Sequence, residues 1–388
     1  MKTLALISLI FAQQAFADLE WSTKASASST VFQRDPESEP RYKANEVFTV
    51  QPRMSWEHDS WKVVGEYFFQ LGRHDGPRDD VRDFYVLLNL DSQYLKAGRT
   101  IEYWGVTESQ QLTNIINQTD IRADIFGDER LGQTLIKWGL VTDRHELSLY
   151  LLPEFRARRF PAKASRPRFF SGVNRLPINT EKTTSLTNPD WVARVIGSWD
   201  AFEYSLSLFD GLSREPLLAL QATPPNLELY YETLKQLGAD FQYTGENLLL
   251  KAEGVLRQTK SQSYSAITYG FEYTFFDVLQ SGGDIGGFLE HLVDKRDSQK
   301  GGRHLLYNDN HIFYGLRWTG NDTANSSLLA GFLKQTDTRS QYGRLQFELR
   351  GFLGLRYSLD SLFIVSQTEN DNFAAADNFV KITGEFTF

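Results

Sequence analysis

The side chains best able to do chemistry in this 388-residue chain are concentrated in two segments. Residues 156–175 hold seven basic residues and no acidic one, although the whole chain has a formal net charge of −8. Guanidinium groups at this density raise the concentration of anions within about one Debye length, roughly 8–10 Å. The candidate residues for attracting anions are Arg156, Arg158, Arg159, Arg166 and Arg168.

The second segment covers residues 102–132, in which asparagine and aspartate are interspersed with apolar side chains. An amide side chain both donates and accepts hydrogen bonds, and it tolerates the backbone conformations of turns. Tyr103, Trp104 and Ile116 favour packing over exposure to water, so the segment is expected to fold back onto the protein. The candidate residues for contacting a solute there are Asn114, Asn117, Asp120, Arg122 and Asp124.

Catalytic motifs are missing from the sequence. It has neither the Gly-x-Ser-x-Gly turn of a nucleophilic serine nor the His-Glu-x-x-His pair of a zinc hydrolase. The six histidines are scattered, and His58 and His145 fall in short connections far from any shared pocket. We therefore expect no enzymatic activity, no metal site and no cofactor.

The first residues have the pattern of an export signal. Lys2 precedes the apolar stretch 4–11, and Ala15 and Ala17 form a small-x-small cleavage pattern. The prediction is a cleaved signal peptide over 1–17 and a single domain over 18–388. The chain has no cysteine, so no disulfide stabilises the exported protein. Its acidic balance disfavours nucleic-acid binding.

Alternation of apolar and polar residues is the dominant pattern of the remaining chain. In 343–350 the odd positions after Gly343 are apolar and the even positions are charged or amide, which is the period of a strand with two unlike faces. The same period recurs along the sequence and predicts eighteen strands, with sixteen as the alternative count. The predicted strands are 19–31, 47–57, 60–73, 81–90, 93–101, 133–141, 145–153, 189–199, 201–209, 232–244, 247–259, 262–276, 284–294, 309–319, 324–336, 341–357, 361–368 and 378–388.

The connections between these strands alternate short and long. Tryptophans such as Trp61, Trp199 and Trp318 lie beside the short ones, as at the headgroup level of a membrane. A transmembrane β-barrel has this asymmetry, with short periplasmic turns and long outer loops. The last strand ends in Phe388, which resembles the assembly signal of bacterial outer-membrane proteins. The predicted fold is an all-β, transmembrane, antiparallel up-and-down barrel in the Gram-negative outer membrane.

The alternation also predicts which charged side chains face the lumen. Both signs occur on this face, and acidic members include Asp240, Glu253 and Glu272. Such charges either screen passing solutes or cross-link a hydrated wall. The predicted lumen-facing residues retained as site candidates are Arg194, Lys251, Arg257, Arg317, Arg344, Glu348, Arg350 and Arg356.

One stretch resembles a known family. Gly98-Arg99 is followed by Trp104-Gly105 and then by Asn114, Asn117 and Asp120, with Gln118 where a proline often stands. This order resembles the uncharacterised DUF1302-type outer-membrane proteins over residues 98–130. The resemblance implies a porin-like barrel and no more specific activity.

These patterns together predict a porin-like channel for passive passage of small hydrophilic solutes. Anions would be favoured if residues 156–175, here called the basic loop, lie at the mouth of the pore. The alternatives are an export pore for polysaccharide or lipid with a periplasmic partner, and a structural or adhesive barrel that conducts nothing. Expected partners are outer-membrane lipids, lipopolysaccharide (an alternative contact for the basic loop), the barrel assembly machinery and the solutes. The sequence is compatible with a monomer and with a homo-oligomer.

Overall fold

A computed structural model of the chain describes residues 19–33, 42–123, 129–161, 165–166, 175–220, 227–297, 303–304, 310–338, 340–366 and 377–388. The predicted signal peptide lies outside these residues. Within them, no helix has the length and apolar character needed to cross a lipid bilayer.

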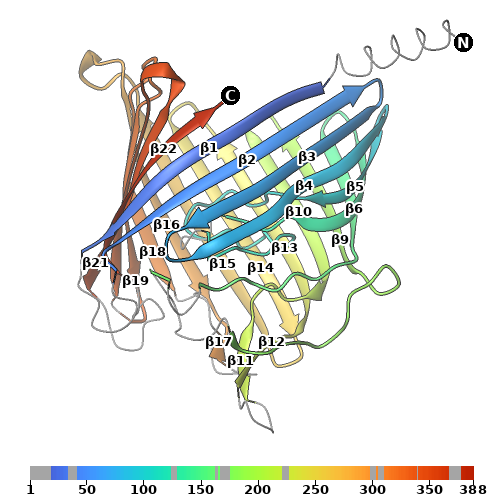
Figure 1. Cartoon of the computed structure of the whole chain (residues 1–388). Coiled ribbons are helices and arrows are strands. Elements are labelled where there is room, and N and C mark those ends of the chain that lie inside the picture. The colour runs from blue at the N-terminus through green and yellow to red at the C-terminus, as the bar shows by residue number, and fades with distance from the viewer. Residues whose placement is uncertain are drawn as a thin grey trace, which may run out of the picture.

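Eighteen antiparallel strands form one closed barrel (Figure 1). Each strand pairs with its neighbour in the chain, and β1 closes the barrel by pairing with both β2 and β22. The strands are β1 (Leu19–Phe32), β2 (Ala44–His58), β3 (Trp61–Gly72), β4 (Gly76–Leu90), β5 (Gln93–Thr100), β6 (Gln133–Val141), β7 (His145–Leu152), β9 (Asp190–Trp199), β10 (Phe202–Leu212), β13 (Thr233–Thr244), β14 (Leu248–Thr259), β15 (Ser263–Phe275), β16 (Asp284–Asp294), β18 (His311–Thr319), β19 (Ser327–Gln335), β20 (Gln341–Arg350), β21 (Arg356–Ser366) and β22 (Phe379–Thr387).

The predicted fold class and the count of eighteen are confirmed, but several strand boundaries are wrong. The strand predicted over 81–90 begins at Gly76, and the largest difference is at the end of β20. The strand predicted over 341–357 ends at Arg350, and β21 begins at Arg356. The chain reverses between them through a short 3₁₀ segment, Phe352–Gly354, in which Leu353 and Gly354 have φ of 60° and 75°. Apolar residues continue through this turn, so the alternation alone did not show the break.

Every connection is short at the end of the barrel that also holds the start of β1 and the end of β22, here called the turn end (Figure 1). Asp59, Asp91 and Asp200 start three of them with φ of 50–52°. Aspartate tolerates this left-handed conformation, which two-residue hairpins need to match the twist of their strands. The opposite end, the loop end, carries all the long connections, together with short ones after β3 and β14.

The two faces of the wall differ in polarity. Large apolar side chains such as Phe84, Leu206, Leu256 and Leu316 are exposed on the outer face. Buried charged side chains, including Arg194, alternate with them on the inner face. Closure satisfies every backbone ladder without a free edge, which hydrocarbon requires. The outer face is therefore suited to lipid and the inner face to a hydrated lumen.

A second, four-stranded sheet lies at the loop end, below the barrel in Figure 1. Sequence alternation did not predict it, because its strands are very short and lie within predicted loops. Its strands are β8 (Ile178–Thr180), β11 (Leu217–Leu220), β12 (Leu227–Tyr231) and β17 (Arg303–His304).

Phe388 joins the closing strand to the first strand. Its backbone N–H donates to the carbonyl of Thr23 at 3.1 Å, and its carbonyl accepts from the N–H of Thr23 at 2.8 Å. Deleting Phe388 removes both bonds at the seam, so we expect less inserted barrel and unchanged export. The measurement is the amount of heat-modifiable protein in the outer membrane compared with the total exported protein. A normal amount of inserted barrel would contradict the role of Phe388 in assembly.

Candidate pore constriction

The connection between β5 and β6, here called the crossing loop (residues 101–132), runs across the inside of the barrel. Its residues contact inner-face side chains of β14 and β16. Four strands, β7, β9, β10 and β13, separate β6 from β14 around the barrel, so these contacts reach across the lumen. In Figure 1 its trace lies between the near strands β3 and β4 and the far strands β13 and β14. The crossing loop therefore narrows the lumen.

Glu253 on β14 is the main anchor of the crossing loop. Its Oε1 accepts from the backbone N–H of Val106 and Thr107 at 2.7 and 2.8 Å, and from the Thr107 hydroxyl at 2.7 Å. Its Oε2 accepts from the N–H and hydroxyl of Thr113, each at 3.1 Å. Glu253 is 1% exposed, so these donors replace the water that its carboxylate loses.

Glu290 on β16 holds the next residues of the loop. Its carboxylate accepts from the backbone N–H of Glu108 at 2.9 Å and of Ser109 at 2.7 Å. The carboxylate of Glu108 in turn pairs with Arg317 at 2.7 Å and with Lys251 at 3.3 Å. Burial raises the pKa of Glu108, but these two cations outweigh burial and hold it below the ordinary value. Glu108 therefore stays charged and bridges the loop to two strands.

The base of the crossing loop packs against the wall on an apolar cluster. Trp104, Ile115 and Ile116 are buried against side chains of five strands, and the guanidinium of Arg194 lies 4.3 Å above the Trp104 ring. Glu102 pairs with Lys96 at 2.8 Å. The wall side of the cluster consists of Leu135, Tyr150, Leu152, Val192, Phe209 and Leu234.

The predicted solute-contacting residues occupy different environments. Asn117 is 1% exposed, and its amide bonds to backbone groups at the two ends of the crossing loop. It accepts from the N–H of Glu102 and donates to the carbonyls of Leu131 and of Thr100, the last residue of β5. Asn117 therefore stabilises the loop and does not present its amide to solutes. Asn114 donates to Gln111.

The last three residues of that predicted set lie further along the loop. Asp120 is buried, and its carboxylate accepts from the N–H of Arg122. Arg122 lines a hollow at the loop end. Asp124 lies outside the described residues.

The predicted lumen-facing residues divide into two groups by what they contact. The first group, Arg194, Lys251, Arg257 and Arg317, bonds to or stacks on the crossing loop. In the second group, Arg344 pairs with Asp360 and Arg356 with Glu348, while Arg350 is exposed. The second group lies on β20 and β21, away from the loop's anchors.

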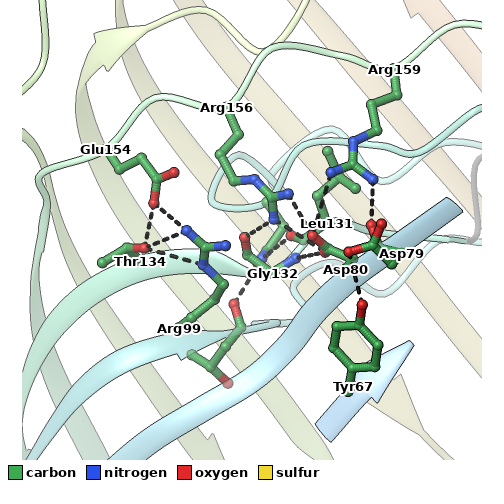
Figure 2. Close-up of polar contacts among 12 residues, drawn as sticks. Tyr67, Asp79, Asp80, Arg99, Leu131, Gly132, Thr134, Glu154, Arg156 and Arg159 are labelled. Carbon is green, nitrogen blue, oxygen red and sulfur yellow. Dashed lines mark hydrogen bonds and ion pairs between the residues drawn. The ribbon is translucent and has the colours of Figure 1, made fainter. Parts of the chain in front are cut away.

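The basic loop is fastened to the wall at its first arginines (Figure 2). Asp80 on β4 pairs with Arg156 at 2.6 Å and lies 3.6 Å from Arg159. Asp80 also accepts from the N–H of Gly132, so it joins this loop to the end of the crossing loop. Because Asp80 offsets part of the charge of Arg156 and Arg159, the field at the mouth is weaker than the sequence alone suggests.

The other basic-loop candidates are also engaged. Arg158 donates to the side-chain oxygen of Gln118 at 3.0 Å. Arg166 pairs with Asp377 at 2.8 Å and covers the ring of Phe32 at 4.4 Å. Arg168 lies outside the described residues.

Replacing Asp80 by alanine should release the basic loop. Arg156 would be left buried without its partner, which costs about 3–5 kcal/mol. We expect trypsin to cleave after Arg156 and Arg159 about a hundredfold faster, because cleavage follows the population of the open loop. Asp79→Ala is the matched control, since Asp79 is exposed and bonds to Tyr67 (Figure 2). Equal cleavage of the two variants would contradict the fastening role of Asp80.

Three residues that matter to this site were not among the sequence-based candidates. Glu290 lies at an inner-face position of β16 and could have been found by extending the alternation over 284–294. Glu108 and Asp80 could not, because their roles depend on partners far away in sequence. No local pattern marks such pairs.

A closed antiparallel barrel of eighteen strands is the fold of outer-membrane porins. The solved structure of OpdO from Pseudomonas aeruginosa matches with a TM-score of 0.56 at 9% identity, covering 97% of this chain and 98% of that one. OccAB3 from Acinetobacter baumannii matches with a TM-score of 0.53 at 11% identity, covering 96% and 99%. OpdQ from P. aeruginosa has a TM-score of 0.53 at 10% identity, covering 95% and 97%. At such low identity the likeness shows a shared fold.

Comparison by sequence adds nothing to this result. No family model matches the chain, and no curated protein sequence is similar to it. The resemblance of residues 98–130 to the DUF1302-type proteins therefore stays a prediction.

Proposed function

We propose that the protein is a non-enzymatic, passive channel in the Gram-negative outer membrane for small hydrophilic solutes that carry an anionic group. The inward-folded, many-point anchored crossing loop carries this proposal. A structural or adhesive barrel needs no such loop, whereas a selective channel needs a narrow, rigid and polar passage.

The crossing loop is bonded to one side of the barrel wall, and this defines the path expected for solutes. Among the described residues of 101–123, hydrogen bonds and ion pairs reach β4–β7, β13–β16 and β18. None reaches β19–β22 or β1–β3, which are here called the unbridged strands. The inner face of the unbridged strands carries charges of both signs, including Arg53, Glu66, Arg344 and Asp360. Solutes are therefore expected to pass between the loop and this wall.

The preference for anionic groups is assigned to cations beside this path rather than to the basic loop as a whole. Arg156 is paired with Asp80, whereas Arg122 and Lys381 form no ion pair with any described residue. Both line the hollow on the unbridged side. Distributed, moderate attraction of this kind concentrates a solute without trapping it.

Conductance in planar bilayers tests the function directly. Purified protein should produce discrete current steps, and a salt gradient should give a reversal potential of the sign for anion preference. The preference should be strongest at low salt, where screening is weak. A correctly folded, inserted protein that gives no current steps would refute the channel. A reversal potential of cation sign would refute the anion preference and leave the channel standing.

A further inference from the structure

A hollow at the loop end lies between the crossing loop and the unbridged wall. Its enclosed volume is about 90 Å³, and it is open to solvent. The wall side is formed by β1–β4, β21 and β22, and the inner side by Ile121–Ala123 with Pro161, Ser165 and Arg166. Thr30, Asn45, Gln70 and Phe379 lie near the loop ends of their strands, so a solute entering from that end meets this hollow early.

Arg78 on β4 is the unusual cation of this hollow. It is 7% exposed, yet its side chain has no hydrogen bond or ion pair with any described residue, and its Nε is fully buried. The carboxylates of Asp75 and Asp120 attract this guanidinium from beyond contact distance, which offsets only part of the cost of burying it. Arg122 and Lys381 line the same hollow, so three cations without an ion pair to a described residue face one space. This arrangement favours an anionic group as the missing partner.

Acceptors without donors lie beside these cations. Asn45 donates to Oδ2 of Asp75 at 2.7 Å, which leaves Oδ1 buried and unbonded. Gln70 donates its amide N–H to Thr49 at 3.0 Å, which leaves its Oε1 buried and unbonded. Three buried side-chain polar atoms that line this hollow thus have no hydrogen-bond partner among the described residues, one donor and two acceptors.

We propose that the hollow binds a small zwitterion, with its anionic group on Arg78, Arg122 and Lys381 and its ammonium group on Asp75 and Gln70. A simple anion would leave Asp75 unsatisfied and repelled, and a simple cation would do the same to Arg78. Only a solute with both groups satisfies both sides. This inference rests on the proposed function and names the class of solute that the channel would select.

Three probes of one skeleton separate the possibilities: alanine carries both groups, propionate lacks the ammonium and ethylamine lacks the carboxylate. Binding is measured by saturation-transfer NMR on the folded protein in detergent micelles, where no conduction is needed. We expect alanine to bind at least about tenfold more tightly than either other probe, because each lost charged contact is replaced by an unpaired group. Equal binding of propionate and alanine, or no binding of alanine to folded protein, would overturn the proposal.

Two substitutions locate the site. Arg78→Gln should weaken alanine binding by about tenfold or more. Asp75→Asn keeps the shape and an acceptor for Asn45, and it should reverse the preference so that propionate binds better than alanine. Arg356→Gln, near the turn end of β21, is the control and should leave binding unchanged. Wild-type affinity in both hollow variants would overturn the proposal even if the protein conducts normally, so its failure is distinct from failure of the channel itself.

Discussion

Deleting residues 108–126 should give a barrel with a much larger single-channel conductance. The deletion removes the part of the crossing loop that bonds to Glu290, Lys251 and Arg317. An unobstructed eighteen-stranded barrel encloses a wide aqueous channel, so we expect the conductance to rise roughly twofold or more. Discrimination between solutes of different charge should fall at the same time. Planar-bilayer recordings and reversal potentials measure both effects.

Folding of the shortened protein is the necessary control. The barrel ladder is formed by strands outside the deletion, so the heat-modifiable band in electrophoresis should persist. A folded variant with the conductance and selectivity of the parent would show that the crossing loop is not the narrowest part. The wall charges would then have to provide selectivity alone.

Replacing Glu253 by glutamine should loosen the crossing loop without removing it. The carboxylate accepts five hydrogen bonds from Val106, Thr107 and Thr113, and bonds to a charged group contribute about 1.5–3 kcal/mol each, though not additively. Glutamine offers one acceptor oxygen and turns an N–H group toward backbone donors. We expect larger open-channel current noise and a shift toward the conductance of the deletion variant.

Glu385→Gln is the matched control for this change. Glu385 on β22 is also acidic and at an inner-face register position opposite Ser26, but no described residue bonds to its side chain. Its replacement should leave current noise at the level of the parent. Current noise at the level of the parent in the Glu253→Gln variant would mean that the apolar contacts of Trp104 and Ile116 hold the crossing loop, and that this carboxylate does not.

The barrel could be predicted because its signal is local and repeated. Segments such as 343–350 show which side of the wall each residue faces, and that period is the same whatever the partner strand. Gly351 and Gly354 were the available signals for the turn that was missed, but Phe352, Leu353 and Leu355 continued the apolar pattern around them. A pattern that depends on polarity alone cannot show a turn made of apolar residues.

The site was predicted less completely, for a physical reason. The asparagines of the crossing loop were expected to face the pore, yet Asn117 bonds to backbone groups of β5 and of its own loop, which is the more common use of a buried amide. Lys251 and Arg317 were expected on the inner face, but their partner Glu108 could not be foreseen. Such pairs follow from how the loop crosses the lumen, which no period in the sequence records.

The way in which the wall holds the crossing loop has a consequence for how such a channel can diversify. Glu253 and Glu290 accept hydrogen bonds from the backbone N–H groups of residues 106–109 and 113. Every amino acid except proline supplies a backbone N–H group. The side chains at several of these positions can therefore change through evolution while the loop stays in place. Selectivity can be retuned in this way without redesigning the fold, and proline at these positions is the replacement that selection should remove.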